Sequence, residues 1–271
     1  PGYEIDVINN GVHSATWASQ SFKDLYDSEI LGWRTDPSQL VLAGQIDDKK
    51  MRSAHRRAKE MLVDDIERQT GVKFDPERPI FGAARRMATY KRMDLPFTDP
   101  EKLYEILRKD GAQIIYAGKA HPDDIPGKMV IQNIYRELKG QRDRGINAAL
   151  KLNYGIKDCR VMVSGSDLWG FFSIVGEEAS STSGMCAAHN GVPQFGTPDG
   201  WWLEGALEGI TGWTFGFEPS DTLRDAHDFY NKLRTTVLPT ITDDAAYAKM
   251  MKDAISLNAS RFNTHRMVNR Y

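Results

Sequence analysis

The sequence predicts an α/β protein built on a Rossmann-like parallel sheet with helices on both faces. Short apolar runs alternate with longer segments of helical periodicity along the chain, which is typical of a parallel sheet whose crossovers are helices. No internal repeat and no low-complexity linker divides the 271 residues, so a single domain is expected. Ligands bind such sheets at the carboxyl ends of the strands.

Six segments are expected to be mainly helical. The first is rich in Ala, Met, Leu, Lys, Arg and Glu, and it places Ala54, Ala58 and Leu62 at helical spacing. Thr98 and Glu101 form a capping-box pattern that begins the second. The six ranges are 37–71, 98–107, 126–150, 178–189, 222–237 and 243–257.

Three short apolar runs are predicted to be buried strands, at 79–84, 113–117 and 160–163. A basic segment follows the first run, and Gly118-Lys119 follows the second. Residues that come directly after these strands are therefore the first candidates for a ligand site.

Charge and cysteine content exclude several classes of function. The 35 basic and 37 acidic residues give a formal net charge of −2, so no overall field attracts nucleic acid or an anionic membrane. No apolar run approaches the roughly 20 residues that span a bilayer, and residues 1–6 lack the pattern of a signal segment. Cys159 and Cys186 are the only cysteines and lack metal or disulfide spacing. We expect a cytoplasmic protein without a metal, and, because it begins at Pro1, a piece of a longer one.

A basic cluster follows the first predicted strand. Arg85, Arg86, Lys91 and Arg92 are four cations within eight residues. The planar fork of Arg matches phosphate oxygens and Lys adds a mobile charge, so such a segment can hold a phosphate and stabilise a departing one. From composition alone a solvated basic turn is the commoner interpretation of such a segment, and the position at a strand end narrows its advantage over a phosphate site.

Hydroxyl groups and a carboxylate are concentrated at the expected start of the 178–189 helix. Glu178, Ser180, Ser181 and Thr182 lie there, where free amide groups and the helix dipole favour an anion. Glu178 can also accept hydrogen bonds from sugar hydroxyls. The alternative is an ordinary helix cap with polar first-turn residues.

Two glycine-containing loops carry aromatic or polar groups. Asp199-Gly200-Trp201-Trp202 offers indole rings that suit sugar binding, although core packing suits them equally. The other loop is Asn9-Asn10-Gly11-Val12-His13. His13 by itself would be read as structural.

Together these segments resemble the short bacterial and archaeal type of α-glucan (glycogen or maltodextrin) phosphorylase, in the same order across nearly all of the chain. The segments that carry the resemblance are Asn10-Gly11-Val12-His13 with Thr16-Trp17, Ala84-Arg85-Arg86 with Tyr90-Lys91-Arg92, Ala117-Gly118-Lys119-Ala120-His121-Pro122, Asn153-Tyr154, Ser166-Asp167-Leu168-Trp169, Asp199-Gly200-Trp201-Trp202 with Glu204, and Phe262-Asn263-Thr264-His265-Arg266-Met267.

The resemblance implies the GT-B fold, in which two Rossmann-like domains face each other across a cleft. Residues 1–271 would form the C-terminal, donor-binding domain, and the N-terminal, acceptor-side domain would lie outside this chain. In the family, the residues at Arg86 and Lys91 contact phosphate, and those at Glu178 and Ser180 contact the donor glucose, where Ser181 and Thr182 are also expected. Further candidates in the cleft are Arg85, Gly11, His13, Lys119, Asn153, Tyr154 and Asp199. The implied reaction is transfer of an α-glucosyl unit with retention, and no metal is implied.

The chain departs from the family at the cofactor position. Phosphorylases have a lysine there that forms a Schiff base with pyridoxal phosphate, whereas this chain has Cys186. A thiol cannot form a stable imine, so ordinary cofactor attachment is expected to be absent. The family's glycine has become Ser181, and the segment 170–176 is also changed.

Three functions remain open at this point. The first is a transferase that uses a nucleotide-diphosphate sugar without pyridoxal phosphate, because Gly170-Phe171-Phe172, Glu178 and Asn190-Gly191-Val192-Pro193 are similar to the donor-site pattern of those enzymes. The second is a phosphorylase that binds pyridoxal phosphate non-covalently. The third is a catalytically silent glucan-binding or regulatory subunit. The expected partners are an α-glucan or another sugar acceptor, the N-terminal GT-B domain in the same or another chain, and a homo-oligomer.

Overall fold

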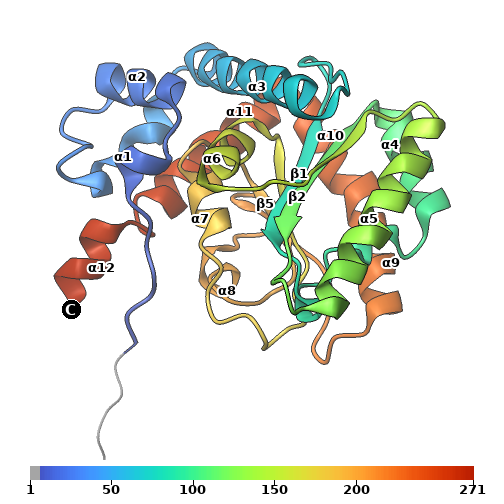
Figure 1. The fold of residues 1–271 in the computed structure, drawn as a ribbon. Helices are drawn as coiled ribbons and strands as arrows, with labels where there is room; N and C mark the ends of the chain where they lie inside the picture. Colours follow the sequence, from blue (N-terminus) through green and yellow to red (C-terminus); the bar gives the residue numbers. More distant parts are fainter. Residues whose placement is uncertain (1–6) are drawn as a thin grey trace, which may run out of the picture.

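A computed structural model describes residues 7–271 and places a six-stranded parallel sheet at the centre of the molecule (Figure 1). The strand order is β3-β2-β1-β4-β5-β6, the order of a Rossmann fold, which confirms the predicted fold class. The direction of winding reverses between β1 and β4, so the topological switch point lies at their carboxyl ends. The strands are β1 (Ile80–Arg86), β2 (Gln113–Lys119), β3 (Ala148–Lys151), β4 (Leu168–Phe171), β5 (Gln194–Gly196) and β6 (Gly212–Thr214).

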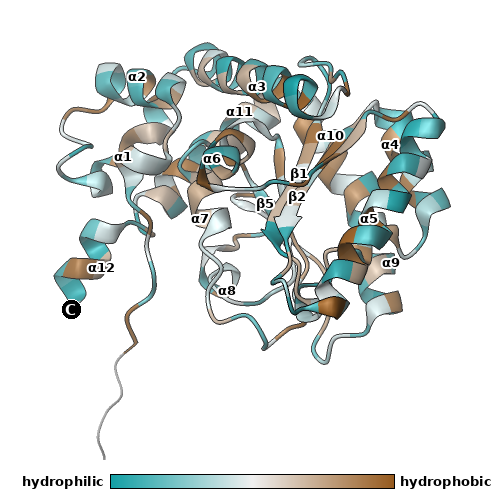
Figure 2. Cartoon of the chain, viewed as in Figure 1, coloured by the Kyte–Doolittle hydropathy of each residue, from teal (hydrophilic) through white to brown (hydrophobic). Residues whose placement is uncertain are grey.

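Helices cover both faces of the sheet, as predicted. Along β1 the side chains alternate between two apolar layers, with Phe81 and Ala83 in one and Ile80 and Ala84 in the other. Figure 2 shows apolar residues concentrated on the strands and on the inner sides of the helices. The first layer includes α4 (Pro100–Asp110), α5 (Ile125–Asp143) and α9 (Thr222–Lys232), and the second α3 (Asp48–Thr70), α6 (Ile156–Gly165) and α7 (Ser183–Ala188).

The two ends of the described chain lie side by side. Val12 pairs with Asn263, and its amide donates to the Phe262 carbonyl at 3.1 Å. Gly11 is required there, because a Cβ atom would lie 2.3 Å from the Asn263 oxygen. The remaining helical segments are α1 (Ser14–Trp17), α2 (Gln20–Glu29), η1 (Pro37–Gln45), η2 (Thr89–Lys91), η3 (Leu95–Phe97), α8 (Trp202–Gly205), η4 (Leu233–Val237), α10 (Leu238–Thr242), α11 (Asp244–Asp253), η5 (Ala254–Ala259) and α12 (Thr264–Arg270).

One predicted helix is interrupted and another begins later than predicted, in both cases because an aspartate caps a helix at an unexpected position. The 37–71 helix is divided into η1 and α3, since the Asp47 side chain accepts from the Lys49 amide at 2.9 Å and begins a new helix. The second helix begins at Pro100, because Asp99 rather than Thr98 is its N-cap.

Other predictions fail where short apolar runs are ambiguous between strand and helix. Residues 160–163 belong to α6, and their apolar side chains lie in the apolar layer between this helix and the sheet. The 126–150 helix ends at Asp143 and is followed by β3, while β4, β5 and β6 were not predicted. The 222–237 and 243–257 helices are confirmed, although each includes a π-helical segment, η4 in the first and η5 in the second.

The 178–189 helix begins only at Ser183, so residues 178–182 form a loop. Ser181 has φ +62°, which is incompatible with a helix, and the Ser180 carbonyl accepts from the Trp201 amide at 2.8 Å. The predicted placement of Glu178 in the first turn of this helix is therefore wrong, and its contacts arise from the loop.

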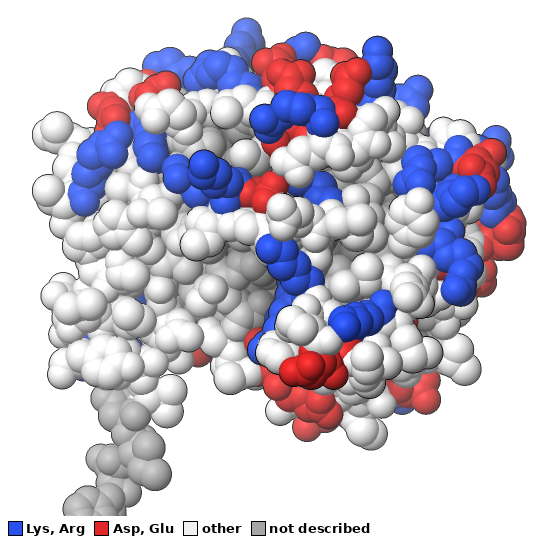
Figure 3. Space-filling model, in the orientation of Figure 1, with Lys and Arg blue, Asp and Glu red and all other residues white. Residues whose placement is uncertain are grey.

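Acidic and basic side chains are mixed over the face that Figure 3 shows, in keeping with the nearly balanced composition. Within residues 7–271, no helix combines the length and apolar character needed to cross a bilayer. The first six residues, which showed no signal-segment pattern, lie outside the described part of the chain.

Lys151 ends β3, and its fully buried side chain pairs with two partly buried carboxylates. Its amine contacts Asp65 and lies 2.8 Å from Asp158 Oδ1. Partial burial by itself would raise the pKa of Asp158, but hydrogen bonds from Lys151, Gln69 and the Gly155 amide outweigh it and lower the pKa to about 2. The cluster therefore holds the loop after β3 in a manner that depends on ionised carboxylates.

We expect this cluster to contribute to acid unfolding. The folded-state pKa of Asp158 lies below the unfolded value of about 3.9, so its contribution is complete above pH 4 and is lost as the pH falls toward 2. The urea midpoint of the wild type should fall over this range, and the fall should be smaller in Asp158→Asn. Asp123→Asn is the control, because the Asp123 side chain is 92% exposed. If the urea midpoint falls equally with pH in all three proteins, the prediction is contradicted.

Candidate functional site

A cavity of about 260 Å³ lies at the carboxyl end of β1, beside the switch point of the sheet. Its walls come from α1, the end of β1, the turn η2, the segment before α6, the loop after β4, and residues of α6 and α7. The lining residues are Trp17, Ala84, Arg85, Arg86, Lys91, Tyr154, Cys159, Glu178, Ser181, Thr182, Ser183 and Cys186. The cavity thus brings together eight of the candidates from the sequence: Arg85, Arg86, Lys91, Tyr154, Glu178, Ser181, Thr182 and Cys186.

Two buried cations share one carboxylate in this pocket. Arg85 Nη2 lies 2.5 Å from Glu178 Oε2, and the Lys91 amine contacts the same oxygen. The three side chains are 4%, 7% and 11% exposed, so little solvent screens the pairs. Burial lowers the pKa of the Arg85 guanidinium, and Glu178 opposes this shift by stabilising the charged form. One carboxylate offsets only one of the two cations, so the pocket keeps a net positive charge.

Further contacts orient Arg85. Its Nη2 also donates to Ser181 Oγ at 2.9 Å, and its guanidinium lies 4.5 Å from the centre of the Phe171 ring. The Nη1 atom is buried and has no hydrogen-bond partner within residues 7–271. A buried guanidinium donor without a partner is costly, and an anionic ligand in the pocket would satisfy it.

Arg86 differs from its neighbour because consecutive strand residues point in opposite directions. Its side chain is exposed at the pocket wall, and no hydrogen bond or ion pair of its guanidinium occurs in the described part of the chain. Arg86 is therefore the exposed, unpaired cation of the pocket, while Arg85 is the buried, paired one.

Asp199 shapes the loop that carries Glu178. Its buried carboxylate accepts from the amides of Gly176 at 3.1 Å, Glu178 at 3.0 Å and Gly200 at 2.9 Å. Gly200 has φ +54°, and a Cβ atom there would lie 2.5 Å from the Ser180 carbonyl oxygen. Asp199, which was predicted as a candidate in the cleft, thus supports the site from behind rather than lining it.

The other candidates lie outside this pocket. Ser180 lines a neighbouring cavity of about 200 Å³ together with Asn9, Asn10, Trp201 and Glu204. Gly11 packs against Asn263, and the exposed His13 bonds Thr16 at 2.8 Å and stacks on His265 at 6.1 Å. Lys119 and Asn153 are exposed and line neither cavity. Sequence reasoning missed four residues of the pocket: Trp17 and Ala84, which lie within quoted motifs, and Cys159 and Ser183, which were not singled out.

Cys186 forms part of the pocket wall and is 2% exposed. Burial raises the pKa of its thiol well above the usual range, so the side chain is a neutral thiol at physiological pH. Lys91 is the only lysine among the lining residues, and Glu178 already holds its amine. The pocket offers cations for a phosphate group but no free amine for an imine, so it does not fit covalently attached pyridoxal phosphate.

The fold and this pocket define a class: a Rossmann-like domain with paired cations and a carboxylate at its switch point, an arrangement suited to a phosphate-bearing ligand. The carbohydrate phosphorylase family model matches residues 4–238, and the chain belongs to this family. This confirms the family expected from the motifs.

Two curated relatives align with 98% of the chain. They are a maltodextrin phosphorylase of Thermococcus litoralis, 37% identical, and a glycogen phosphorylase of Aquifex aeolicus, 36% identical. A glycogen phosphorylase of Mycobacterium tuberculosis is 33% identical over 77% of the chain. The alignments cover 35%, 43% and 26% of these relatives, so the chain spans less than half of their length.

Proposed function

We propose that this chain is the donor-binding half of a GT-B glycosyltransferase that transfers an α-glucosyl unit, with retention, from a nucleotide-diphosphate sugar and without pyridoxal phosphate. The observation that carries the proposal is the pocket itself. It combines the Arg85–Glu178–Lys91 ion pairs with a free Arg86, and Cys186 stands where the family's cofactor lysine is expected.

The charged residues of the pocket can take separate roles in such a transfer. Arg86, Lys91 and the unpaired Nη1 of Arg85 would bind the diphosphate and stabilise the charge that develops as it departs. Within residues 7–271, no hydrogen bond uses Glu178 Oε1, so that oxygen is available to accept from a hydroxyl of the donor sugar. The bond from sugar C1 to the phosphate oxygen breaks, the bond from C1 to the acceptor oxygen forms, and the acceptor proton passes to the departing phosphate.

A lone donor domain leaves the acceptor side of the cleft open. We therefore propose that an N-terminal GT-B domain, in the same or another chain, supplies the surface for an α-glucan or another sugar acceptor. Closure of the two halves would exclude water from the pocket. A homo-oligomer and a cytoplasmic location belong to the same proposal.

The second candidate function is that of an α-glucan phosphorylase that binds pyridoxal phosphate without a covalent bond. The two relatives that align with 98% of the chain are named as phosphorylases, which favours this function. A non-catalytic glucan-binding or regulatory subunit is the third. The retained, buried pairing of Arg85 and Lys91 with Glu178 argues against it, because a decayed site would not keep costly buried charges.

Calorimetric titration of this chain with UDP-glucose, ADP-glucose and a GDP-sugar tests the proposal, with pyridoxal phosphate as the comparator. We expect saturable binding of one nucleotide sugar and a loss of roughly tenfold or more in Arg86→Ala, since a charge-assisted hydrogen bond is worth about 1.5–3 kcal/mol. Lys119→Ala is the matched control, because Lys119 also ends a strand but lines neither cavity. Binding of pyridoxal phosphate but of no nucleotide sugar would support the phosphorylase. If the chain binds none of these ligands, both enzyme functions are overturned for this chain.

A cofactor test asks, without measuring activity, whether pyridoxal phosphate attaches covalently in the pocket. The chain is incubated with pyridoxal phosphate and reduced with borohydride, and its mass is then measured by mass spectrometry. We expect no adduct at the pocket of the wild type, because Lys91 is held by Glu178. Cys186→Lys is the positive control for a site that can form the imine. A wild-type adduct mapped to Lys91 would contradict the absence of a covalent cofactor.

A further inference from the structure

Arg92 directly follows Lys91 and occupies an unusual backbone position. Its φ is +41°, one of only two positive values at non-glycine residues within 7–271, the other being Ser181. The side chain is 7% exposed although it is charged. A bulky residue in the left-handed region costs roughly 1 kcal/mol or more, and it persists only where surrounding contacts compensate. The side-chain contacts of Arg92 are therefore the reason that the turn exists in this form.

The guanidinium of Arg92 connects the turn after β1 with the loop after β4 and with helix α9. Nε donates to the Phe172 carbonyl at 2.9 Å, Nη2 to the Ser173 carbonyl at 3.0 Å and Nη1 to Asp225 Oδ2 at 2.7 Å. Asp225 is fully buried, and its other oxygen accepts from the Phe217 amide at 3.1 Å. The fork geometry of Arg allows these three bonds at once, which a lysine cannot reproduce.

The loop that receives Arg92 is the one that leads to Glu178. The Ile174 amide donates to the Tyr90 carbonyl at 2.8 Å, so the turn before Arg92 is bound to the same segment. Residues on both sides of Lys91 are thus bound to residues 172–174, four positions before Glu178. These bonds fix the separation of the Lys91 backbone from the Glu178 loop and bring the amine to the carboxylate.

We propose that Arg92 is the positioning residue of the pocket, which holds Lys91 against Glu178 and so sets the place where the distal phosphate binds. The inference rests on the proposed function for the identity of the ligand, and on the geometry alone for the dependence of Lys91 on Arg92. A misplacement of about 1 Å at such a group is enough to lower affinity or rate by roughly a hundredfold.

The first test needs no ligand. The folded chain is treated briefly with acetic anhydride, and acetylation of each lysine is measured by mass spectrometry. In the wild type we expect slow modification of Lys91, which is 7% exposed, and fast modification of the exposed Lys119. Arg92→Lys and Arg92→Gly should each raise the rate at Lys91 by roughly tenfold or more.

Lys151 is the internal control for unfolding, because it is fully buried in a separate ion-pair cluster. Its rate should not change in the Arg92 variants. The glycine variant separates the two roles of Arg92, since glycine adopts the same φ without strain but has no guanidinium. An unchanged rate at Lys91, or equal increases at Lys91 and Lys151, would overturn the inference. If the Arg92 variants do not fold, Asp225→Asn is used, because it weakens one of the three bonds and keeps the other two.

A binding cycle gives the second readout, with pyrophosphate as the probe. Arg92→Lys and Lys91→Met should each weaken pyrophosphate binding, and the double variant should bind no more weakly than Lys91→Met, because Arg92 acts through Lys91. Additive losses would contradict the proposal. Arg142→Lys is a control for a partly buried arginine that bonds a carbonyl, that of Ala148, outside the pocket. A wild type that binds neither pyrophosphate nor a nucleotide sugar would refute the proposed function, and the acetylation rates would still decide the role of Arg92.

Discussion

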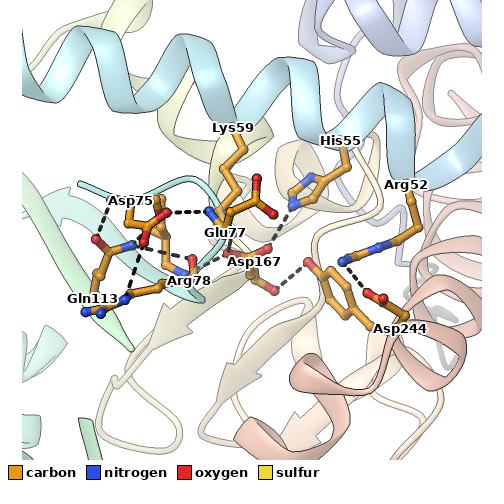
Figure 4. A network of polar contacts seen from close by, with 11 residues as sticks. Arg52, His55, Lys59, Asp75, Glu77, Arg78, Gln113, Asp167 and Asp244 are labelled. Atoms are coloured by element: carbon orange, nitrogen blue, oxygen red, sulfur yellow. Dashed lines mark hydrogen bonds and ion pairs between the residues drawn. The ribbon is translucent and has the colours of Figure 1, made fainter. Parts of the chain in front are cut away.

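Replacing Asp167 by alanine is expected to lower the free energy of unfolding by about 3–5 kcal/mol, because it leaves a buried lysine without its counter-charge. Asp167 is 3% exposed and directly precedes β4, at the amino-terminal edge of the sheet. Figure 4 shows its carboxylate beside His55 and Lys59 of α3. Its carboxylate lies 2.7 Å from the Lys59 amine and 3.0 Å from His55 Nε2, and it accepts from the Ile80 amide at 2.7 Å.

These contacts join elements that are far apart in the sequence. Lys59 and His55 come from α3, Ile80 begins β1, and the Tyr247 hydroxyl of α11 donates to the Asp167 carbonyl at 2.9 Å. Burial by itself would raise the pKa of Asp167, but Lys59 and His55 outweigh it and hold the pKa well below its usual range. The carboxylate is therefore ionised throughout the neutral range, and the whole network depends on it.

Urea denaturation followed by tryptophan fluorescence measures the effect. Asp244→Ala is the matched control, because Asp244 also pairs with a cation of α3, Arg52 at 2.8 Å, but its side chain is 88% exposed. Its loss should cost no more than about 1 kcal/mol. A cost below about 1 kcal/mol for Asp167→Ala would show that the buried pairs contribute little. Asp167→Asn keeps the shape of the side chain. Its loss in the free energy of unfolding should lie between the losses of Asp244→Ala and Asp167→Ala.

The second large effect is expected in the pocket: Lys91→Met should weaken binding of pyrophosphate, and of the proposed nucleotide sugar, by about 2–4 kcal/mol, or roughly 30- to 1000-fold. The methionine keeps the apolar stem of the side chain and removes only the charge. Because Lys91 is 7% exposed, water cannot replace its contribution. Lys119→Met, at the exposed end of the neighbouring strand, should change affinity by less than about threefold.

Glu178→Gln should have the opposite effect on the simple anion. Removing the carboxylate leaves Arg85 and Lys91 without a counter-charge, so the affinity for pyrophosphate should rise. Binding of the sugar part of a donor should weaken, because Glu178 is expected to accept from its hydroxyls. Calorimetry with pyrophosphate and with the nucleotide sugar separates the two effects. Weaker binding of pyrophosphate in Glu178→Gln would show that this variant disturbs the loop rather than its charge.

The strands that were predicted correctly are those whose own residues form a clear apolar run. The strands expected at 79–84 and 113–117 correspond to β1 and β2, because each is a continuous apolar run long enough to be recognised. The runs that form β4, β5 and β6 are only three or four residues long, and periodicity cannot be read from so few positions. Residues 160–163 form part of α6 instead, because packing against α3 and the sheet, not propensity, decided their conformation.

The candidate site was predicted as two separate clusters, and only the fold joined them. Arg85 and Glu178 are 93 positions apart, and their contact depends on the pairing of β1 with β4. The sequence predicted Glu178 in a helix, whereas it lies in a loop that the buried Asp199 holds through three amides. The role of Asp199 depends on backbone groups that carry no signature in the residue types.

By itself, the sequence determined the fold class, the family and two of the segments that line the pocket, since these follow from apolar periodicity and from motifs in a fixed order. Only the tertiary structure decided that Arg85 is the buried partner of Glu178 and that Arg86 is exposed. Alternation along β1 requires the two side chains to point in opposite directions, but which one faces the loop depends on how the sheet packs. The same holds for Arg92, whose three bonds exist only once distant segments have come together.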